Sequence, residues 1–237
     1  MRTILFAPEL FTGGGGIPRI LRLYLKAICE LSKDGDPVAF LSLNDRLVDS
    51  SDLKRYTNAS LVEWEICDKN KFAFARAGLR MGRKADRIVC GHVAQLPLAW
   101  AAARLNPSAK YYLIAHGIEV WRSFTFLERV ALRGATGVWC VSDFTRRRVL
   151  EHISIPEDRL KLLPNALDPF LSPQLPPSPS TGAPYILSIS RLSTADGYKG
   201  IDHLIESMPS VLRQIPDARL RIVGRGVGFP GLQGQVR

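Results

Sequence analysis

The stretch that most constrains this chain runs from Ser188 to Met208. The apolar run Tyr185–Ile189 predicts a buried strand, and Arg191 stands just beyond it. Lys199 and Gly200 follow, and then apolar residues recur at helical spacing. A strand, a loop with two cations and a helix that begins at glycine can form an anion site, because free N–H groups and full charges point at one place. The alternative is two solvated cations on an ordinary loop.

A similar pattern opens the chain. Thr3–Ala7 predicts a buried strand, and four glycines follow at positions 13–16. The predicted helix after them places five apolar residues on one face: Ile17, Leu21, Leu25, Ile28 and Leu31. Glycine lets a ligand approach the backbone closely because it has no Cβ, although a flexible connector is the alternative.

Two reactive side chains follow another predicted strand. Tyr111–Ala115 is apolar, and His116 and Glu119 come directly after it. Open α/β sheets bind ligands at the carboxyl ends of their strands, which makes both residues candidate site residues. A histidine with a purely structural role is the alternative.

Three linked segments resemble the donor-binding half of the retaining glycosyltransferases of the group 1 type, also called GT4. They are residues 186–192, 196–206 and 216–226. The resemblance implies an α/β, GT-B-like fold, with one complete Rossmann-like domain and the first part of a second. It implies transfer of a hexose from a nucleotide-sugar to an acceptor hydroxyl with retention of configuration.

The resemblance also assigns roles to residues at matching positions. Arg191 and Lys199 would hold the donor diphosphate, and His116, with Glu119 close by, would lie beside the transferred sugar. This charge stabilisation needs neither a metal nor another cofactor. The expected partners are the nucleotide-sugar and an acceptor that is a glycan, a lipid or a small molecule.

The glycine-rich turn matches a further family pattern, Gly-Gly-x-x-Arg. Here Gly15 and Gly16 would contact the donor phosphate, and Arg19 would face the cleft on the acceptor side. The segment Pro164–Asp168 resembles the family's Pro-Asn-Gly-x-Asp, with Ala166 in place of the glycine.

Composition predicts a linker at residues 172–184, which are rich in proline and serine. The resemblance implies that residues 1–171 form an acceptor-side Rossmann-like domain and residues 185–237 an incomplete donor-binding domain. The last eleven residues, 227–237, lack the family's Glu-x-Phe-Gly-x-x-x-x-Glu element. We therefore expect a truncated donor domain, from a frameshift, an early stop or a fragment. An inactive remnant that binds an acceptor or an anionic membrane is the alternative.

The net charge of +10 favours anionic partners. Residues 69–87 predict a basic helix with Arg76, Arg80 and Arg83 on one face, which suits peripheral contact with an anionic membrane or simply a solvated face. Its apolar face is predicted to hold Phe72, Ala75 and Leu79. We expect no nucleic-acid partner, because no aromatic platform accompanies the basic residues.

The four cysteines fall in predicted helices and strands without a C-x-x-C motif, which predicts buried, reduced thiols and no metal site. No apolar run reaches the length of a membrane span. We therefore expect a cytoplasmic protein, with peripheral contact at the inner membrane face as a further expectation.

Overall fold

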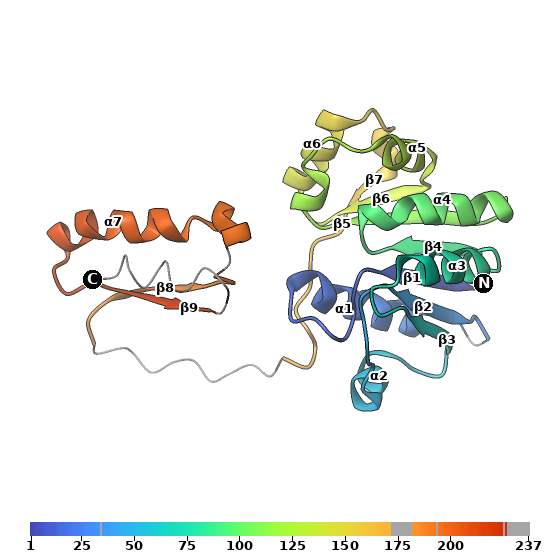
Figure 1. Cartoon of the computed structure of the whole chain (residues 1–237), viewed down its shortest axis with the longest axis horizontal. Helices are drawn as coiled ribbons and strands as arrows, with labels where there is room; N and C mark the ends of the chain where they lie inside the picture. The colour runs from blue at the N-terminus through green and yellow to red at the C-terminus, as the bar shows by residue number, and fades with distance from the viewer. Residues whose placement is uncertain (34, 172–181, 193, 225, 227–237) are drawn as a thin grey trace. The chain divides into compact units, whose positions relative to one another are not determined.

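The computed structural model describes residues 1–33, 35–171, 182–192, 194–224 and 226 (Figure 1). The chain separates into two compact units, Met1–Ser172 and Pro173–Arg237. Most of the predicted linker (172–181) and the divergent tail (227–237) lie outside the described residues.

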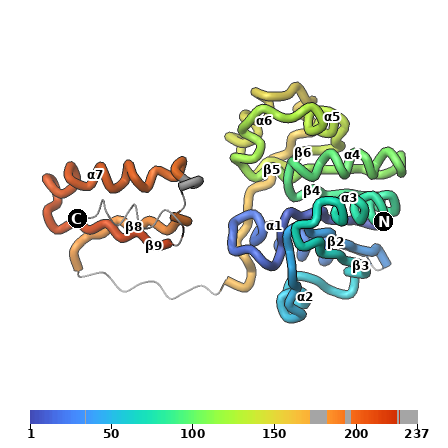
Figure 2. Tube along the Cα trace, in the orientation of Figure 1, coloured from blue at the N-terminus to red at the C-terminus, as the bar shows by residue number. Residues whose placement is uncertain are grey.

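The first unit contains a seven-stranded parallel sheet in the order β3-β2-β1-β4-β5-β6-β7, which confirms the predicted α/β class (Figures 1 and 2). Its strands are β1 (Thr3–Ala7), β2 (Val38–Ser42), β3 (Leu61–Ile66), β4 (Arg87–Cys90), β5 (Lys110–Ala115), β6 (Gly137–Cys140) and β7 (Leu160–Leu162). Its helices are α1 (Gly16–Leu31), α2 (Ser50–Tyr56), α3 (Lys71–Gly82), α4 (Leu96–Leu105), α5 (Phe126–Gly134) and α6 (Asp143–His152). Short 3-10 helices are η1 (Val93–Gln95), η2 (Ile118–Val120) and η3 (Glu157–Arg159).

Strand β1, an inner strand of the sheet, is buried on both faces. Ile4 and Phe6 join a core with residues of α3, α4 and α5, whereas Leu5 and Ala7 join a second core with residues of α1. Because helices cover both faces of a parallel sheet, its inner strands read as continuous apolar runs. This explains why β1 was predictable from its sequence.

The strand order reverses between β1 and β4. The chain passes from β1 to β2 and β3 on one side, and β4 then pairs with the other side of β1. Ligands of open α/β sheets bind outside the carboxyl ends of the strands at such a reversal. Gly91, just after β4, fits this crowded place, because an added Cβ would lie 2.7 Å from the Leu21 side chain and 3.2 Å from the Phe6 carbonyl oxygen.

The predicted apolar faces of two helices were partly wrong. Leu31 ends α1 and is exposed, whereas Ile20 and Cys29 are buried. On α3 the side chain of Phe72 is 80% exposed, and the buried stripe instead includes Phe74 and its neighbours Ala77, Gly78, Met81 and Gly82.

Small residues decide which face of α3 is buried. A Cβ on Gly78 would lie 2.4 Å from Leu98 of α4, and one on Gly82 would lie 2.7 Å from the Cβ of Ala102. The helices approach closely along the glycines, so the larger Phe72 is left outside. The helix also ends at Gly82, before Arg83. Arg80 pairs with Glu63 and Glu65 of β3, which reduces the predicted basic face.

The second unit contains β8 (Tyr185–Ile189), η4 (Thr194–Lys199), α7 (Ile201–Gln214) and β9 (Arg219–Val223), with β8 and β9 parallel. The predicted strand, loop and helix are therefore confirmed. Gly200 caps α7 with a φ of 67°, in the left-handed region that glycine adopts at little cost. The prediction that β8 is buried was wrong: Leu187 is half exposed, because β9 is its one partner among the described strands.

All four cysteines are buried and free, as predicted. Among the described residues, no helix combines the length and the apolar character that crossing a bilayer requires.

Candidate active site

The glycine-rich turn after β1 leads into α1 at the carboxyl edge of the sheet. Gly15 is the N-cap of α1 and offers no side-chain hydrogen bond, so the first N–H groups of the helix have no capping side chain. Arg19 lies one turn further on and is exposed. The predicted contacts of Gly15, Gly16 and Arg19 with a ligand stay predictions, and the structure places all three beside the strand-order reversal.

A buried carboxylate holds the turn that precedes the glycines. Asp45 is fully buried, and it accepts hydrogen bonds from the backbone N–H groups of Leu10 (2.8 Å), Phe11 (2.9 Å) and Thr12 (2.7 Å). The Ser42 hydroxyl donates to it as well, at 2.6 Å. Asp45 is thus a positioning residue for the turn. Sequence reasoning missed it because it lies in what reads as a polar connection, with no motif around it.

His116 is mostly buried just beyond β5, at the same edge of the sheet. Its Nε2 atom lies 3.1 Å from the carbonyl oxygen of Gly91, which follows β4. Since a carbonyl can only accept, Nε2 carries the proton in the neutral ring and Nδ1 is left as an acceptor. Nδ1 is buried and has no hydrogen-bond partner among the described residues. The ring therefore has one acceptor available for a ligand.

Glu119 fixes the backbone around His116. One carboxylate oxygen, Oε1, accepts hydrogen bonds from the N–H groups of His116 (2.6 Å) and Gly117 (3.1 Å). This geometry gives Glu119 a role in orienting the turn. The prediction that it is a catalytic group stays a prediction.

Charged groups near His92 complete this edge. Arg122 donates to both oxygens of Glu128, at 2.8 and 3.0 Å, and Glu128 is only 4% exposed. Glu128 also forms a capping box with Thr125 at the start of α5. Sequence reasoning missed this pair, although Thr125-x-x-Glu128 is the pattern that signals such a cap.

Burial lowers the pKa of both histidines at this edge. The pKa of His116 lies below its ordinary value of 6.5 because burial disfavours the charged ring, and the nearby Glu119 carboxylate only partly offsets this. The pKa of His92 is lowered for the same reason. Both rings are therefore neutral at pH 7.

These shifts predict that the first unit loses stability in mild acid. Below about pH 6.5 the unfolded chain binds protons at both histidines that the native chain resists, so the free energy of unfolding falls as the pH falls. All four tryptophans lie in the first unit, so their fluorescence follows its thermal unfolding between pH 7.5 and 5.5. The drop should be smaller in His116→Gln and unchanged in the control His203→Gln. A wild-type midpoint independent of pH would contradict this prediction.

The other predicted site residues belong to the second unit. Arg191 is exposed two positions after β8, and Lys199 is the last residue of η4, next to the Gly200 cap of α7. A Cβ on Gly224, just after β9, would lie 1.9 Å from the carbonyl oxygen of Ser190, so glycine allows the backbone beside Arg191 to pack closely. The structure brings both cations to the loop between β8 and α7. Their contact with a diphosphate stays a prediction.

Comparison with known proteins connects these features. The family model described as Glycosyltransferase Family 4 matches residues 28–169, more than half of the chain. Two relatives are named GDP-mannose-dependent alpha-(1-6)-phosphatidylinositol monomannoside mannosyltransferase. The Mycolicibacterium smegmatis protein is 32% identical over 158 residues, which are 60% of this chain and 40% of the relative. The Mycobacterium tuberculosis protein is 31% identical over 151 residues, which are 57% and 37%. This chain thus spans about 40% of the length of these relatives.

Solved structures share the fold. Anabaena Alr3699/HepE in complex with UDP has a TM-score of 0.70 and 15% identity, and the match covers 99% of this chain and 65% of that one. The apo form of the lipopolysaccharide outer core galactosyltransferase WaaB has a TM-score of 0.63 and 15% identity, with 99% and 64% covered. At these identities the likeness shows the fold alone. Because the family match spans more than half of the chain and GT-B structures share its architecture, the chain belongs to glycosyltransferase family 4, the group 1 type.

Proposed function

We propose that this chain is part of a glycosyltransferase that moves a hexose from a nucleotide-sugar to an acceptor hydroxyl, with retention at the anomeric carbon. The observation that carries the proposal is the His116 ring, whose Nδ1 acceptor is buried at the carboxyl edge of the sheet and has no hydrogen-bond partner in the described part of the chain. Relatives named for GDP-mannose and a solved neighbour in complex with UDP-glucose support a nucleotide-sugar donor.

The first unit would contribute orientation. A sugar hydroxyl would donate a hydrogen bond to Nδ1 of His116, and Glu119 would keep the ring in place through the backbone of the turn. The uncapped N–H groups at the start of α1 would face the donor phosphate beside Gly15 and Gly16. Arg19 would lie on the acceptor side.

The second unit would contribute charge. As the bond to the diphosphate breaks, negative charge accumulates on the leaving oxygen, and Arg191 and Lys199 would stabilise it together with the amino terminus of α7. Two cations and a helix terminus can stabilise this charge without a metal ion. We therefore propose a reaction that uses no metal or other cofactor.

Nucleotide binding tests the proposal directly. Calorimetric titration of the whole chain with UDP, GDP and their monophosphates should show saturable binding of at least one diphosphate. The monophosphate of the same base should bind about tenfold more weakly or worse, because it lacks the second phosphate that the cations hold. Absence of saturable binding for every diphosphate would instead favour a protein that only binds an acceptor or an anionic membrane surface.

A further inference from the structure

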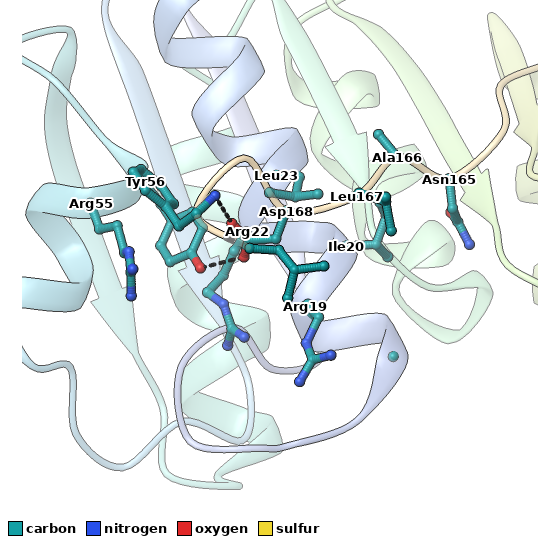
Figure 3. A pocket seen from close by; sticks show the side chains of 13 residues that line it. Arg19, Ile20, Arg22, Leu23, Arg55, Tyr56, Asn165, Ala166, Leu167 and Asp168 are labelled. Carbon is teal, nitrogen blue, oxygen red and sulfur yellow. Dashed lines mark hydrogen bonds between the residues drawn. The ribbon is translucent and has the colours of Figure 1, made fainter. Parts of the chain in front are cut away.

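A pocket of about 410 Å³ lies in the first unit, beside the glycine-rich turn (Figure 3). Three segments line it: the amino-terminal half of α1, the end of α2, and the chain after β7. The lining includes Arg19, Arg22, Arg55, Tyr56, Asp168 and Phe170. Of the lining residues, the proposed sugar transfer uses only Gly16 and Arg19.

The pocket is strongly basic. Figure 3 shows the guanidinium groups of Arg19, Arg22 and Arg55 in a row along the same side of the view. Asp168 is the single acidic residue among the lining residues. Many arginines elsewhere in the unit pair with carboxylates, such as Arg80 with Glu63. The lining thus sets three positive charges against one negative charge.

The carboxylate of Asp168 already has its own partners. One oxygen accepts a hydrogen bond from the Tyr56 hydroxyl at 2.7 Å, and the other accepts one from the Phe170 N–H at 2.9 Å. Burial acts to raise the pKa of Asp168, but these hydrogen bonds and the charges of Arg55 and Arg22 outweigh it and lower the pKa. No ion pair joins Asp168 to Arg19, Arg22 or Arg55 in the described part of the chain, so the arginines keep donors for a ligand.

Aromatic rings hold two of the arginines in place. The Arg55 guanidinium lies 4.5 Å from the centre of the Phe170 ring, and that of Arg22 lies 5.5 Å from the centre of the Tyr56 ring. Arg22 also donates to the Leu10 carbonyl oxygen. Side chains ordered in advance lose less entropy when a ligand binds. An arginine stacked by its face on a ring keeps its edge donors, which match the oxygens of phosphate.

We propose that this pocket binds a phosphate group of the acceptor. Three guanidinium groups match the charge and the several oxygens of a phosphate better than those of a single carboxylate. The pocket is larger than a phosphate, and Ile20, Leu23 and Leu167 in its lining suit carbon atoms attached to it. Gly16, the first residue of α1, also lines the pocket, so the pocket reaches the glycine-rich turn. The identification of the ligand as the acceptor rests on the proposed function, whereas phosphate binding by the pocket does not.

Two neighbouring residues of α2 allow a matched test. Arg55 is exposed and lines the pocket, whereas Lys54 is exposed and does not line it. We would titrate the whole chain with inorganic phosphate and with sn-glycerol 3-phosphate by calorimetry, at constant ionic strength. Saturable binding should weaken at least tenfold in Arg55→Gln and stay unchanged in Lys54→Gln. Circular dichroism of both variants would establish that they fold.

Vesicles then distinguish the source of the phosphate. A lipid headgroup would be identified if the chain co-sediments with phosphatidylglycerol vesicles but not with phosphatidylcholine vesicles. This co-sedimentation should be lost in Arg55→Gln and kept in Lys54→Gln. Binding of the soluble esters without such co-sedimentation would identify a soluble phosphate ester. No saturable phosphate binding, or equal binding by Arg55→Gln and wild type, overturns the inference. Failure of the proposed function would give a different result: the wild-type chain would bind phosphate but would bind no nucleoside diphosphate.

Discussion

Asp45→Ala is expected to lower the free energy of unfolding of the first unit by about 3 kcal/mol or more. The substitution leaves the N–H groups of three consecutive residues, 10–12, and the Ser42 hydroxyl without their acceptor; the bonds from Leu10 and Ser42 are buried, and the other two are partly buried. Each buried donor without a partner costs about 1–3 kcal/mol, and relaxation of the turn recovers part of the sum. Urea unfolding followed by tryptophan fluorescence measures the loss.

Two further variants show whether the hydrogen bonds are the cause. Asp45→Asn keeps one acceptor oxygen of similar shape, so its loss should be smaller than that of the alanine variant. Glu30→Ala removes the same charge from an exposed pair with Lys26 on α1, and it should change stability little. An alanine variant as stable as wild type would show that Asp45 does not hold the turn.

Arg191→Ala and Lys199→Ala are each expected to lower the rate of donor cleavage by about 10²-fold or more. Both cations lie on the loop between β8 and α7, where the proposed function places the leaving diphosphate. Their stabilising effect is greatest when the bond to the sugar is breaking, so kcat should fall more than substrate affinity does. Release of nucleoside diphosphate from the donor that binds in the nucleotide titration measures the rate without knowledge of the acceptor.

A third arginine provides the control for this experiment. Arg213 is exposed near the end of α7, and its side chain donates to the Ser210 hydroxyl at 2.8 Å. Arg213→Ala removes the same charge from the second unit without touching the loop, and it should leave the rate unchanged. If both loop variants were as fast as Arg213→Ala, the diphosphate would have to be bound elsewhere.

Strands, caps and loop positions were predictable from the sequence because their causes are local. β1 reads as an apolar run because it is buried on both faces. Serine is a residue type favoured at N-caps, and Ser142 caps α6, where its hydroxyl accepts from the Thr145 N–H. The positions of His116 and Lys199 were predictable in the same way, since each follows a strand or precedes a helix in the sequence. The family resemblance added the roles.

Features that depend on distant contacts were not predictable. Phe72 fits an apolar helical face in the sequence, but the approach of α4 to the glycines of α3 leaves it outside. The helix α2 lies inside a stretch that reads as a polar connection, and it contributes Arg55 and Tyr56 to the pocket. Likewise, the hydrogen bond between Tyr56 and Asp168 joins residues far apart in the chain, so no local sequence pattern predicts it.

The strand-order reversal also determines when the candidate site appears during folding. Thr3 of β1 pairs with Arg87 of β4, so their contact closes a segment that contains two other strands and three helices. Closing a long segment costs more chain entropy than pairing β1 with β2 or β4 with β5, which makes it a slow, late event. The glycine-rich turn belongs to the first half of the sheet and His116 to the second. A partly folded chain can therefore contain the glycine-rich turn or the His116 turn alone. Ligand binding at this edge becomes possible only when the two halves of the sheet have joined.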